Sequence, residues 1–185
     1  MIDHLLLSKA DIDRILSRFA HEILEKNGGI SKLAIIGIRK GGTRLADRIC
    51  QNIQQIEGTK PCLGYLDINL YRDDFALQEK IPVVKKTEIE FNIEDTKVVL
   101  VDDVLYTGRT IRAAMDALMD LGRPALIQLA VLIDRWLREL PIQADFIGKS
   151  ITTLSEQNVV VYFGEKDQED SAIVSEKKRE DRRQE

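Results

Sequence analysis

The stretch Val98–Thr110, which reads VVLVDDVLYTGRT, decides how this chain is expected to fold. Its first four residues are aliphatic, which is typical of a strand that is buried on both faces of a sheet. Two adjacent carboxylates, Asp102 and Asp103, follow where such a strand would end. A short loop rich in hydroxyl groups, glycine and backbone amides comes next, and a helical pattern begins directly after it.

This strand–loop–helix order predicts a ligand site. In open α/β sheets, ligands bind beyond the carboxyl ends of the strands, often with an anion at the N-terminus of the following helix. Paired carboxylates suit ribose hydroxyl groups or a metal ion, and the loop Thr107–Thr110 suits a phosphate group. A phosphorylated sugar satisfies both halves of the stretch at once.

Two further segments repeat the pattern on either side. Leu33–Ile38 is expected to be a buried strand, and the glycine-containing basic loop Arg39–Gly42 and a helix follow it. Leu126–Ile133 is expected to be another buried strand, and it ends in Asp134 and Arg135. A short glycine-rich basic loop is weak evidence alone, but the carboxyl ends of parallel strands meet at one edge of a sheet. The three loops are therefore expected to come together.

The rest of the chain supports an α/β fold with a mainly parallel central sheet flanked by helices. Ser8 and Asp11 resemble a capping box at the start of a first helix that Asn27 and Gly28 close. The segment 72–82 lacks periodicity and is either an inert loop or a lid over the site. Further strands are expected at Cys62–Leu70, in an alternating pattern at residues 83–91, at Ala144–Ile147 and at Val159–Phe163.

Composition limits the possible functions. The 185 residues suit one domain, expected at 1–175, with a disordered charged tail at 176–185. The net charge of -4 means that a nucleic-acid partner would have to meet a local positive patch. Cys50 and Cys62 lack the spacing of metal ligands, and no apolar run approaches the roughly 20 residues that a membrane span needs. No signal peptide is evident, so a cytoplasmic location is expected.

The motif at Val98–Thr110 resembles the phosphoribosyl pyrophosphate signature of type I phosphoribosyltransferases. Across most of the chain, from Ser8 to Val174, the sequence resembles the PyrR family of pyrimidine operon regulators. The other matching segments are Arg18–Glu22, Tyr71–Asp74, Gly122–Pro124, Ile127–Val131, Arg138–Ile142 and Ala144–Lys149. The resemblance implies a type I phosphoribosyltransferase fold with a small hood and a flexible β-ribbon loop. It also implies uracil phosphoribosyltransferase activity and, in response to uridine nucleotides such as UMP and UTP, binding of the leader mRNA of a pyrimidine operon (transcription attenuation).

The resemblance also implies roles for individual residues. Asp102 and Asp103 would hold the ribose hydroxyl groups, directly or through Mg²⁺, and act in catalysis with Arg72 and Asp73 of the mobile loop. The positions implied for phosphoribosyl pyrophosphate are Arg39, Lys40, Gly41, Gly42, Asp102, Asp103, Val104, Leu105, Tyr106, Thr107, Gly108, Arg109 and Thr110. The positions implied for the uracil base are Asp134, Arg135, Ile147 and Lys149, and those for RNA are Ser17, His21 and Arg138. A homodimer or higher homo-oligomer is expected.

The chain departs from the family pattern in two places. The pyrophosphate loop usually reads Gly-Ile-Lys-Thr-Arg-Gly, whereas here the positive charge is moved to Arg39 and Lys40. After Asp134-Arg135 the family commonly has Gly-His-Arg-Glu-Leu-Pro-Ile-Arg, whereas here Trp136 and Leu137 replace the first pair and Gln143 replaces the last arginine. Two alternatives therefore stay open: a phosphoribosyltransferase for another base with no RNA role, and a nucleotide sensor with vestigial catalysis.

Overall fold

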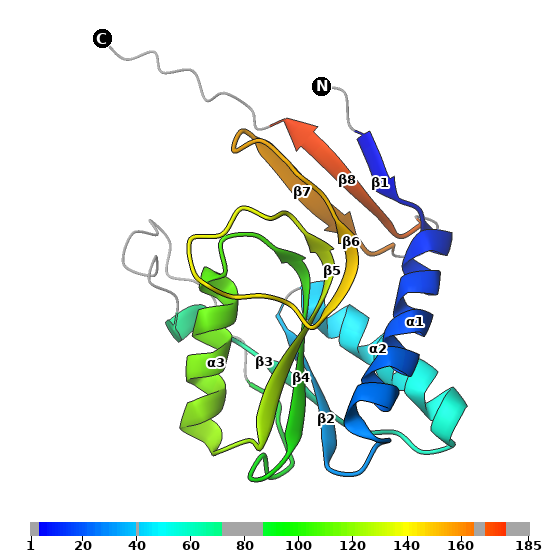
Figure 1. Cartoon of the computed structure of the whole chain (residues 1–185), viewed down its shortest axis with the longest axis vertical. Helices are drawn as coiled ribbons and strands as arrows, with labels where there is room; N and C mark the ends of the chain where they lie inside the picture. The colour runs from blue at the N-terminus through cyan, green and yellow to red at the C-terminus, as the bar shows by residue number, and fades with distance from the viewer. Residues whose placement is uncertain (1–3, 40, 72–86, 165–168, 177–185) are drawn as a thin grey trace.

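The computed structural model describes residues 4–39, 41–71, 87–164 and 169–176. Its main body is a five-stranded parallel sheet with the strand order β3-β2-β4-β5-β6, and helices cover both faces (Figure 1). The strands are β2 (Leu33–Ile38), β3 (Cys62–Leu66), β4 (Lys97–Leu105), β5 (Leu126–Asp134) and β6 (Phe146–Ser150). The predicted fold class is confirmed.

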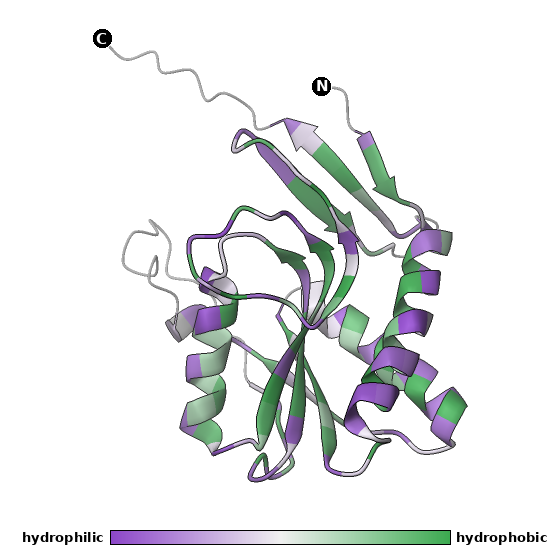
Figure 2. Cartoon of the chain, viewed as in Figure 1, coloured by the Kyte–Doolittle hydropathy of each residue, from purple (hydrophilic) through white to green (hydrophobic). Residues whose placement is uncertain are grey.

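The helices complete two hydrophobic cores, one on each face of the sheet. Helices α1 (Lys9–Asn27) and α2 (Gly41–Glu57) cover one face, and α3 (Arg109–Leu121) covers the other (Figure 1). Because side chains alternate along a strand, Val99 and Val101 of β4 pack under α1 and α2, whereas Val98 and Leu100 pack under α3. Figure 2 shows the result, with hydrophobic central strands between helices whose outer faces are hydrophilic.

A second, antiparallel sheet lies beyond the carboxyl ends of the central strands (Figure 1). It has the order β1-β8-β7, from β1 (His4–Leu7), β7 (Gln157–Tyr162) and β8 (Ser171–Glu176). The sequence predicted β7 but neither β1 nor β8, because these strands are short and the chain around β8 is rich in charge. β8 includes Glu176, the first residue of the expected tail, and 177–185 lie outside the described residues.

The chain after β3 differs from the sequence prediction. The strand expected at Cys62–Leu70 ends at Leu66, because the Asp67 carboxylate accepts a hydrogen bond from the Asn69 amide (2.9 Å) and a short 3-10 helix (Asn69–Tyr71) follows. Of the strand expected near residues 83–91, the described part forms only one antiparallel bridge, between Tyr65 and Glu88. None of the helices within the described ranges is both long and apolar enough to cross a membrane.

The start of α1 confirms the predicted capping box. The Ser8 backbone amide donates to Asp11 Oδ2 (2.9 Å), and the Asp11 amide donates to Ser8 Oγ (3.3 Å). The Ser8 hydroxyl group also donates to Asp11 Oδ2 (2.6 Å), and this bond, followed by the one from the Ser8 amide, lowers the pKa of the Asp11 carboxyl group below its usual range. The helix closes at Gly28, as predicted, with a φ of 67°.

Candidate active site

The register of the central sheet brings the three predicted loops to one edge. Gly37 of β2 pairs with Val101 of β4, and Leu105 of β4 pairs with Asp134 of β5. The basic loop, the loop after β4 and the segment after β5 therefore leave the sheet side by side, below the small antiparallel sheet (Figure 1). Asp102 and Asp103 lie within β4, which continues to Leu105 and does not end before the acids as the sequence predicted. This confirms the expectation that strand ends gather these residues.

Two glycines let the start of α2 approach the acid pair. A Cβ atom on Gly41 would lie 2.1 Å from Asp103 Oδ2, and a Cβ atom on Gly42 would lie 2.0 Å from the Val101 carbonyl oxygen. Neither distance is possible without movement: a Cβ atom on Gly42 would displace the Val101 backbone, whereas one on Gly41 would displace the Asp103 side chain. The two glycines are thus the reason that the basic loop and the carboxylates share one site.

The two acids, Asp102 and Asp103, are neighbours in the sequence and are largely shielded from solvent. Asp102 is 6% exposed and Asp103 is half-buried. Asp102 Oδ1 accepts from the Asp103 amide (3.0 Å), and Asp103 Oδ1 accepts from the Val104 amide (2.9 Å). Burial, followed by the charge of Asp103, raises the pKa of Asp102 well above its usual value, and burial also raises the pKa of Asp103. A bound cation or hydroxyl donor would offset this unfavourable burial of charge.

The loop after β4 is oriented by its carbonyl groups. Thr107 O accepts from the amides of Glu139 (3.0 Å) and Leu140 (3.1 Å), and Tyr106 O accepts from Arg138 NH1 (2.9 Å). Because the peptide group is planar and trans, the amides of Thr107 and Gly108 are directed away from these carbonyl groups. Helix α3 begins directly after this loop, and its dipole favours an anion at the N-terminus.

The segment after β5 is tied down by one buried ion pair. Asp134 is fully buried, and both of its carboxylate oxygens accept from Arg138 NH2 at 2.7 Å. Asp134 Oδ1 also accepts from the Trp136 amide (2.9 Å), and Arg138 Nε donates to the Ile142 carbonyl (2.8 Å). The pair therefore holds the segment 134–142 against the loop after β4.

Arg135 links the loop after β4 to the small sheet. It is 4% exposed, its guanidinium lies 4.0 Å from the centroid of the Tyr106 ring, and its Nε donates to Thr153 Oγ1 (2.9 Å). Its NH2 donates to the Gln157 carbonyl (2.8 Å) at the start of β7. Burial lowers the pKa of Arg135 from its usual value.

The remaining predicted residues lie in three places. Arg39 forms an ion pair with Glu88 (2.8 Å), beside the Tyr65 ring, and its Nε is buried without a hydrogen-bond partner among the described residues. Ile147 and Lys149 are on β6, where Lys149 Nζ donates to the Leu6 carbonyl (2.9 Å). Lys40, Arg72 and Asp73 lie outside the described residues.

Ser17 and His21, predicted to bind RNA, are exposed on α1. This helix packs against α2 and β6. Within the described residues, no hydrogen bond or ion pair joins Ser17 or His21 to Arg138. The structure thus does not bring the predicted RNA residues into one contact cluster.

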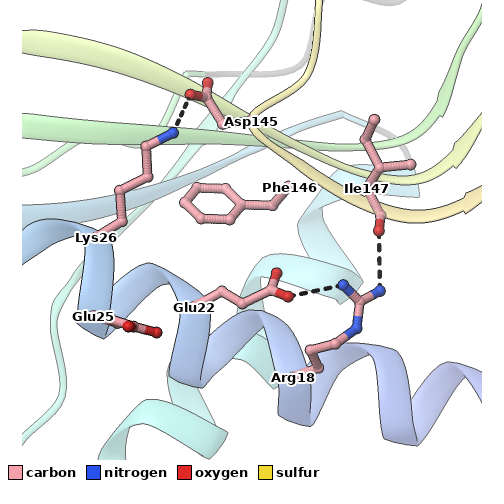
Figure 3. Close-up of a pocket in the computed structure, with 7 residues that line it drawn as sticks. All are labelled: Arg18, Glu22, Glu25, Lys26, Asp145, Phe146 and Ile147. Atoms are coloured by element: carbon pink, nitrogen blue, oxygen red, sulfur yellow. Dashed lines mark hydrogen bonds and ion pairs between the residues drawn. The ribbon is translucent and has the colours of Figure 1, made fainter.

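A pocket of about 520 Å³ lies between α1 and the start of β6 (Figure 3). Arg18 and Lys26 are its cations, but Arg18 pairs with Glu22 (2.9 Å) and Lys26 pairs with Asp145 (2.6 Å). The Phe146 ring lies between the two ion pairs (Figure 3). This mixed lining suits an anion less well than the site at the end of β4 does.

The comparisons with known proteins identify the family of the chain. The family model of the phosphoribosyl transferase domain matches residues 6–168. A bifunctional protein PyrR from Clostridium botulinum is 55% identical over 169 residues, which cover 91% of this chain and 94% of the relative. A bifunctional protein PyrR from Caldicellulosiruptor bescii is 53% identical over 167 residues, covering 90% and 92%.

This chain belongs to the PyrR family.

Solved structures resemble this PyrR-family chain in their fold only. A hypoxanthine-guanine phosphoribosyltransferase from Bacillus anthracis superposes with a TM-score of 0.64 over 82% of this chain and 84% of that one. Its sequence identity is 18%, so it confirms the type I phosphoribosyltransferase fold without indicating the base.

Sequence reasoning missed several residues that shape the site of this PyrR-family chain. Thr153 and Gln157 anchor Arg135, and Glu139 and Leu140 fix the Thr107 carbonyl. Arg138, which is predicted to bind RNA, is also paired with Asp134, a contact that the sequence did not predict; its RNA role stays a prediction. Apart from the Asp134–Arg138 pair, whose members are four residues apart, these contacts join segments that meet only in the folded chain.

Proposed function

We propose that this chain is a bifunctional pyrimidine regulator. It joins uracil to the phosphoribosyl group of phosphoribosyl pyrophosphate, which gives UMP and pyrophosphate, and it binds the leader mRNA of a pyrimidine operon in response to uridine nucleotides. Relatives named bifunctional protein PyrR that are more than half identical over nine-tenths of the chain support the whole function. The observation that carries the enzymatic half is the buried acid pair directly beside the anion-binding start of α3.

The carboxylates fit a divalent cation that the substrate shares. Asp102 and Asp103 lie together with raised pKa values, a state that a cation relieves. In the described part of the chain, no group of three or more His, Cys, Asp or Glu side chains could hold a metal ion. This suits Mg²⁺, which commonly takes one or two carboxylates together with phosphate oxygens. Bound there, the ion would neutralise charge on the departing pyrophosphate.

The chain itself positions the sugar. Asp102 and Asp103 accept hydrogen bonds from the ribose hydroxyl groups, and their charge favours the cationic sugar that forms as pyrophosphate leaves. The amides and hydroxyl groups at Thr107–Thr110 hold the 5′-phosphate. A bond then forms between the anomeric carbon and the uracil ring nitrogen, which loses its proton. Catalysis comes mainly from positioning, since both reacting groups are held at one strand edge.

We propose that the uracil base lies beside the segment after β5, in reach of Arg135, Ile147 and Lys149. The Asp134 oxygens are already bonded to Arg138 and the Trp136 amide. The base is therefore read largely by backbone groups, with Asp134 shaping the segment that offers them.

The regulatory half rests on exposed residues. Ser17 and His21 offer a hydroxyl group and an imidazole on the surface of α1. RNA phosphates are contacted by such groups together with cations, so binding is expected to weaken as salt rises. We further propose one domain at 1–175 with a charged tail after it, a homo-oligomeric state and a cytoplasmic location.

Turnover assays test the enzymatic half. With Mg²⁺ and phosphoribosyl pyrophosphate, uracil should be consumed and UMP released, whereas hypoxanthine and guanine should not react. Preference for a purine would overturn the uracil assignment, and no turnover with any base would favour a nucleotide sensor.

RNA binding tests the regulatory half. A pyrimidine-operon leader RNA should bind more tightly with UMP than without it, and His21→Ala should weaken binding. The exposed Lys9→Ala at the start of α1 is the control for a general loss of charge. Weak binding that is indifferent to UMP would contradict the regulatory role.

A further inference from the structure

Trp136 is an exposed aromatic side chain in a strained backbone conformation. It is the single tryptophan of the chain and is 57% exposed. Its φ of 56° lies in the left-handed region, which disfavours side chains other than glycine. An indole that is neither buried nor relaxed needs a reason other than packing in this fold.

The strained conformation is held by the buried ion pair. The Trp136 amide donates to Asp134 Oδ1 (2.9 Å), and Asp134 is fixed by two bonds from Arg138 NH2. Arg138 in turn donates to the carbonyl groups of Tyr106 and Ile142. The indole therefore stands on a rigid base and not on a loose loop.

The neighbouring arginines are engaged mainly in contacts within the chain. Arg138 uses Nε, NH1 and NH2 for bonds within the chain. Arg135 is 4% exposed and bonds Thr153 and Gln157. At this surface the available recognition chemistry is thus an aromatic face.

We propose that Trp136 is a stacking platform for an unpaired base of the bound RNA. This rests on the regulatory half of the proposed function and states how that RNA is recognised. Every base has a π-face, so stacking on an indole needs no charge and tolerates sequence. The loss of one such platform lowers affinity by about 5-fold to about 150-fold.

The contacts favour RNA over the base of the substrate. The amides of Glu139 and Leu140 and the Arg138 guanidinium bond the carbonyl groups of Thr107 and Tyr106, so the segment already faces the phosphate loop with its backbone. The indole itself is exposed to solvent.

Fluorescence of the single tryptophan gives a direct test. The probes are a pyrimidine-leader hairpin with an unpaired loop and a fully paired RNA duplex of equal length, each with saturating UMP. Quenching by the hairpin, with little change from the duplex or from UMP alone, is the expected result. Quenching by UMP alone, together with a higher KM for uracil in Trp136→Ala, would overturn the proposal in favour of the substrate base.

Variants test the energy of the contact. Trp136→Ala should weaken hairpin binding by about 5-fold or more, with an unchanged slope of log affinity against log salt, and Trp136→Phe should restore most of it. Tyr162→Ala, which removes another half-exposed aromatic side chain, is the matched control and should bind like wild type. Trp136→Gly should raise Tm, because it relieves the left-handed strain, yet bind RNA as weakly as the alanine variant.

Three further outcomes would count against the stacking role of Trp136 or against RNA binding as a whole. Equal hairpin affinity for wild type, Trp136→Ala and Trp136→Gly would overturn the stacking role alone. Loss of the oligomer in both variants would assign Trp136 to a subunit contact instead. If the wild-type chain binds no hairpin at any UMP concentration, the regulatory half of the proposed function fails with it.

Discussion

The ends of β4 and β5 are neighbours in the sheet, yet they treat buried charge in opposite ways. At the end of β4, two carboxylates are packed together with raised pKa values. At the end of β5, the buried Asp134 is paired with Arg138 through both of its oxygens. A group left with unfavourable charge is ready for a ligand, whereas a group that is fully bonded builds structure. The first region is therefore the place of chemistry, and the second is its support.

The largest effect is expected when the support is broken. Arg138→Gln leaves Asp134 buried without its cation, which should lower the free energy of unfolding by about 3 to 5 kcal/mol and Tm by about 10 °C. The pair is well shielded, with side chains 19% and 1% exposed, so solvent screening is small. Thermal unfolding measures this change.

A double variant isolates the pair. Asp134→Asn combined with Arg138→Gln removes both charges and should recover most of the lost stability. If Arg138→Gln alone unfolds like wild type, the ion pair at the end of β5 does not stabilise the fold, and the contrast between the ends of β4 and β5 fails.

The next effect concerns catalysis. Asp103→Asn should reduce uracil transfer by about 100-fold or more, because the ribose loses a charged acceptor, while Tm changes little. Steady-state turnover with Mg²⁺ and phosphoribosyl pyrophosphate checks this. Asp116→Asn, on the exposed side of α3, is the control and should keep wild-type turnover. Near-normal transfer by Asp103→Asn would contradict the ribose role.

The ends of β4 and β5 also differ in how much of their structure could be predicted from the sequence. The region around the acids was largely predictable, since aliphatic run, acids, loop and helix start lie within 13 consecutive residues. Only the strand end was misplaced, because β4 continues through the acids to Leu105. The end of β5 was not predictable, because the partners of Arg135 and Arg138 come from residues 106, 142, 153 and 157. Strands β1 and β8 were missed for the same reason: they form by pairing with segments far away in the sequence, β1 with β8 and β8 with both β1 and β7.

The close approach of α2 gives an intermediate effect. Gly42→Ala places a Cβ atom against the Val101 carbonyl, so the basic loop must move away from the acids, at a cost of about 1 to 3 kcal/mol. Unfolding and turnover should both suffer. Gly58→Ala has a left-handed φ of 72° and open space around its Cβ, so it separates backbone strain from the clash. Wild-type turnover in Gly42→Ala would show that the glycine contact does not place the loop.

The smallest expected effect is a change in how the free energy of unfolding depends on pH. Burial raises the pKa of Asp102 in the folded chain above its ordinary value of 3.8, so the folded state holds its proton more tightly than the unfolded state does. This contribution to stability is present below pH 3.8 and is lost as pH rises toward the raised value, by at most about 1.4 kcal/mol per pH unit. Carboxyl groups with lowered pKa values, such as Asp11 and Asp13, act in the opposite sense.

The test is therefore the difference between wild type and Asp102→Asn in unfolding free energy, measured without Mg²⁺ or substrate. The variant should gain on wild type as pH rises, and saturating Mg²⁺ with phosphoribosyl pyrophosphate should reverse that gain, because only the wild-type carboxylate pair holds the ligand. A difference that is constant with pH would mean that the acids at the end of β4 are as well satisfied as Asp134 at the end of β5.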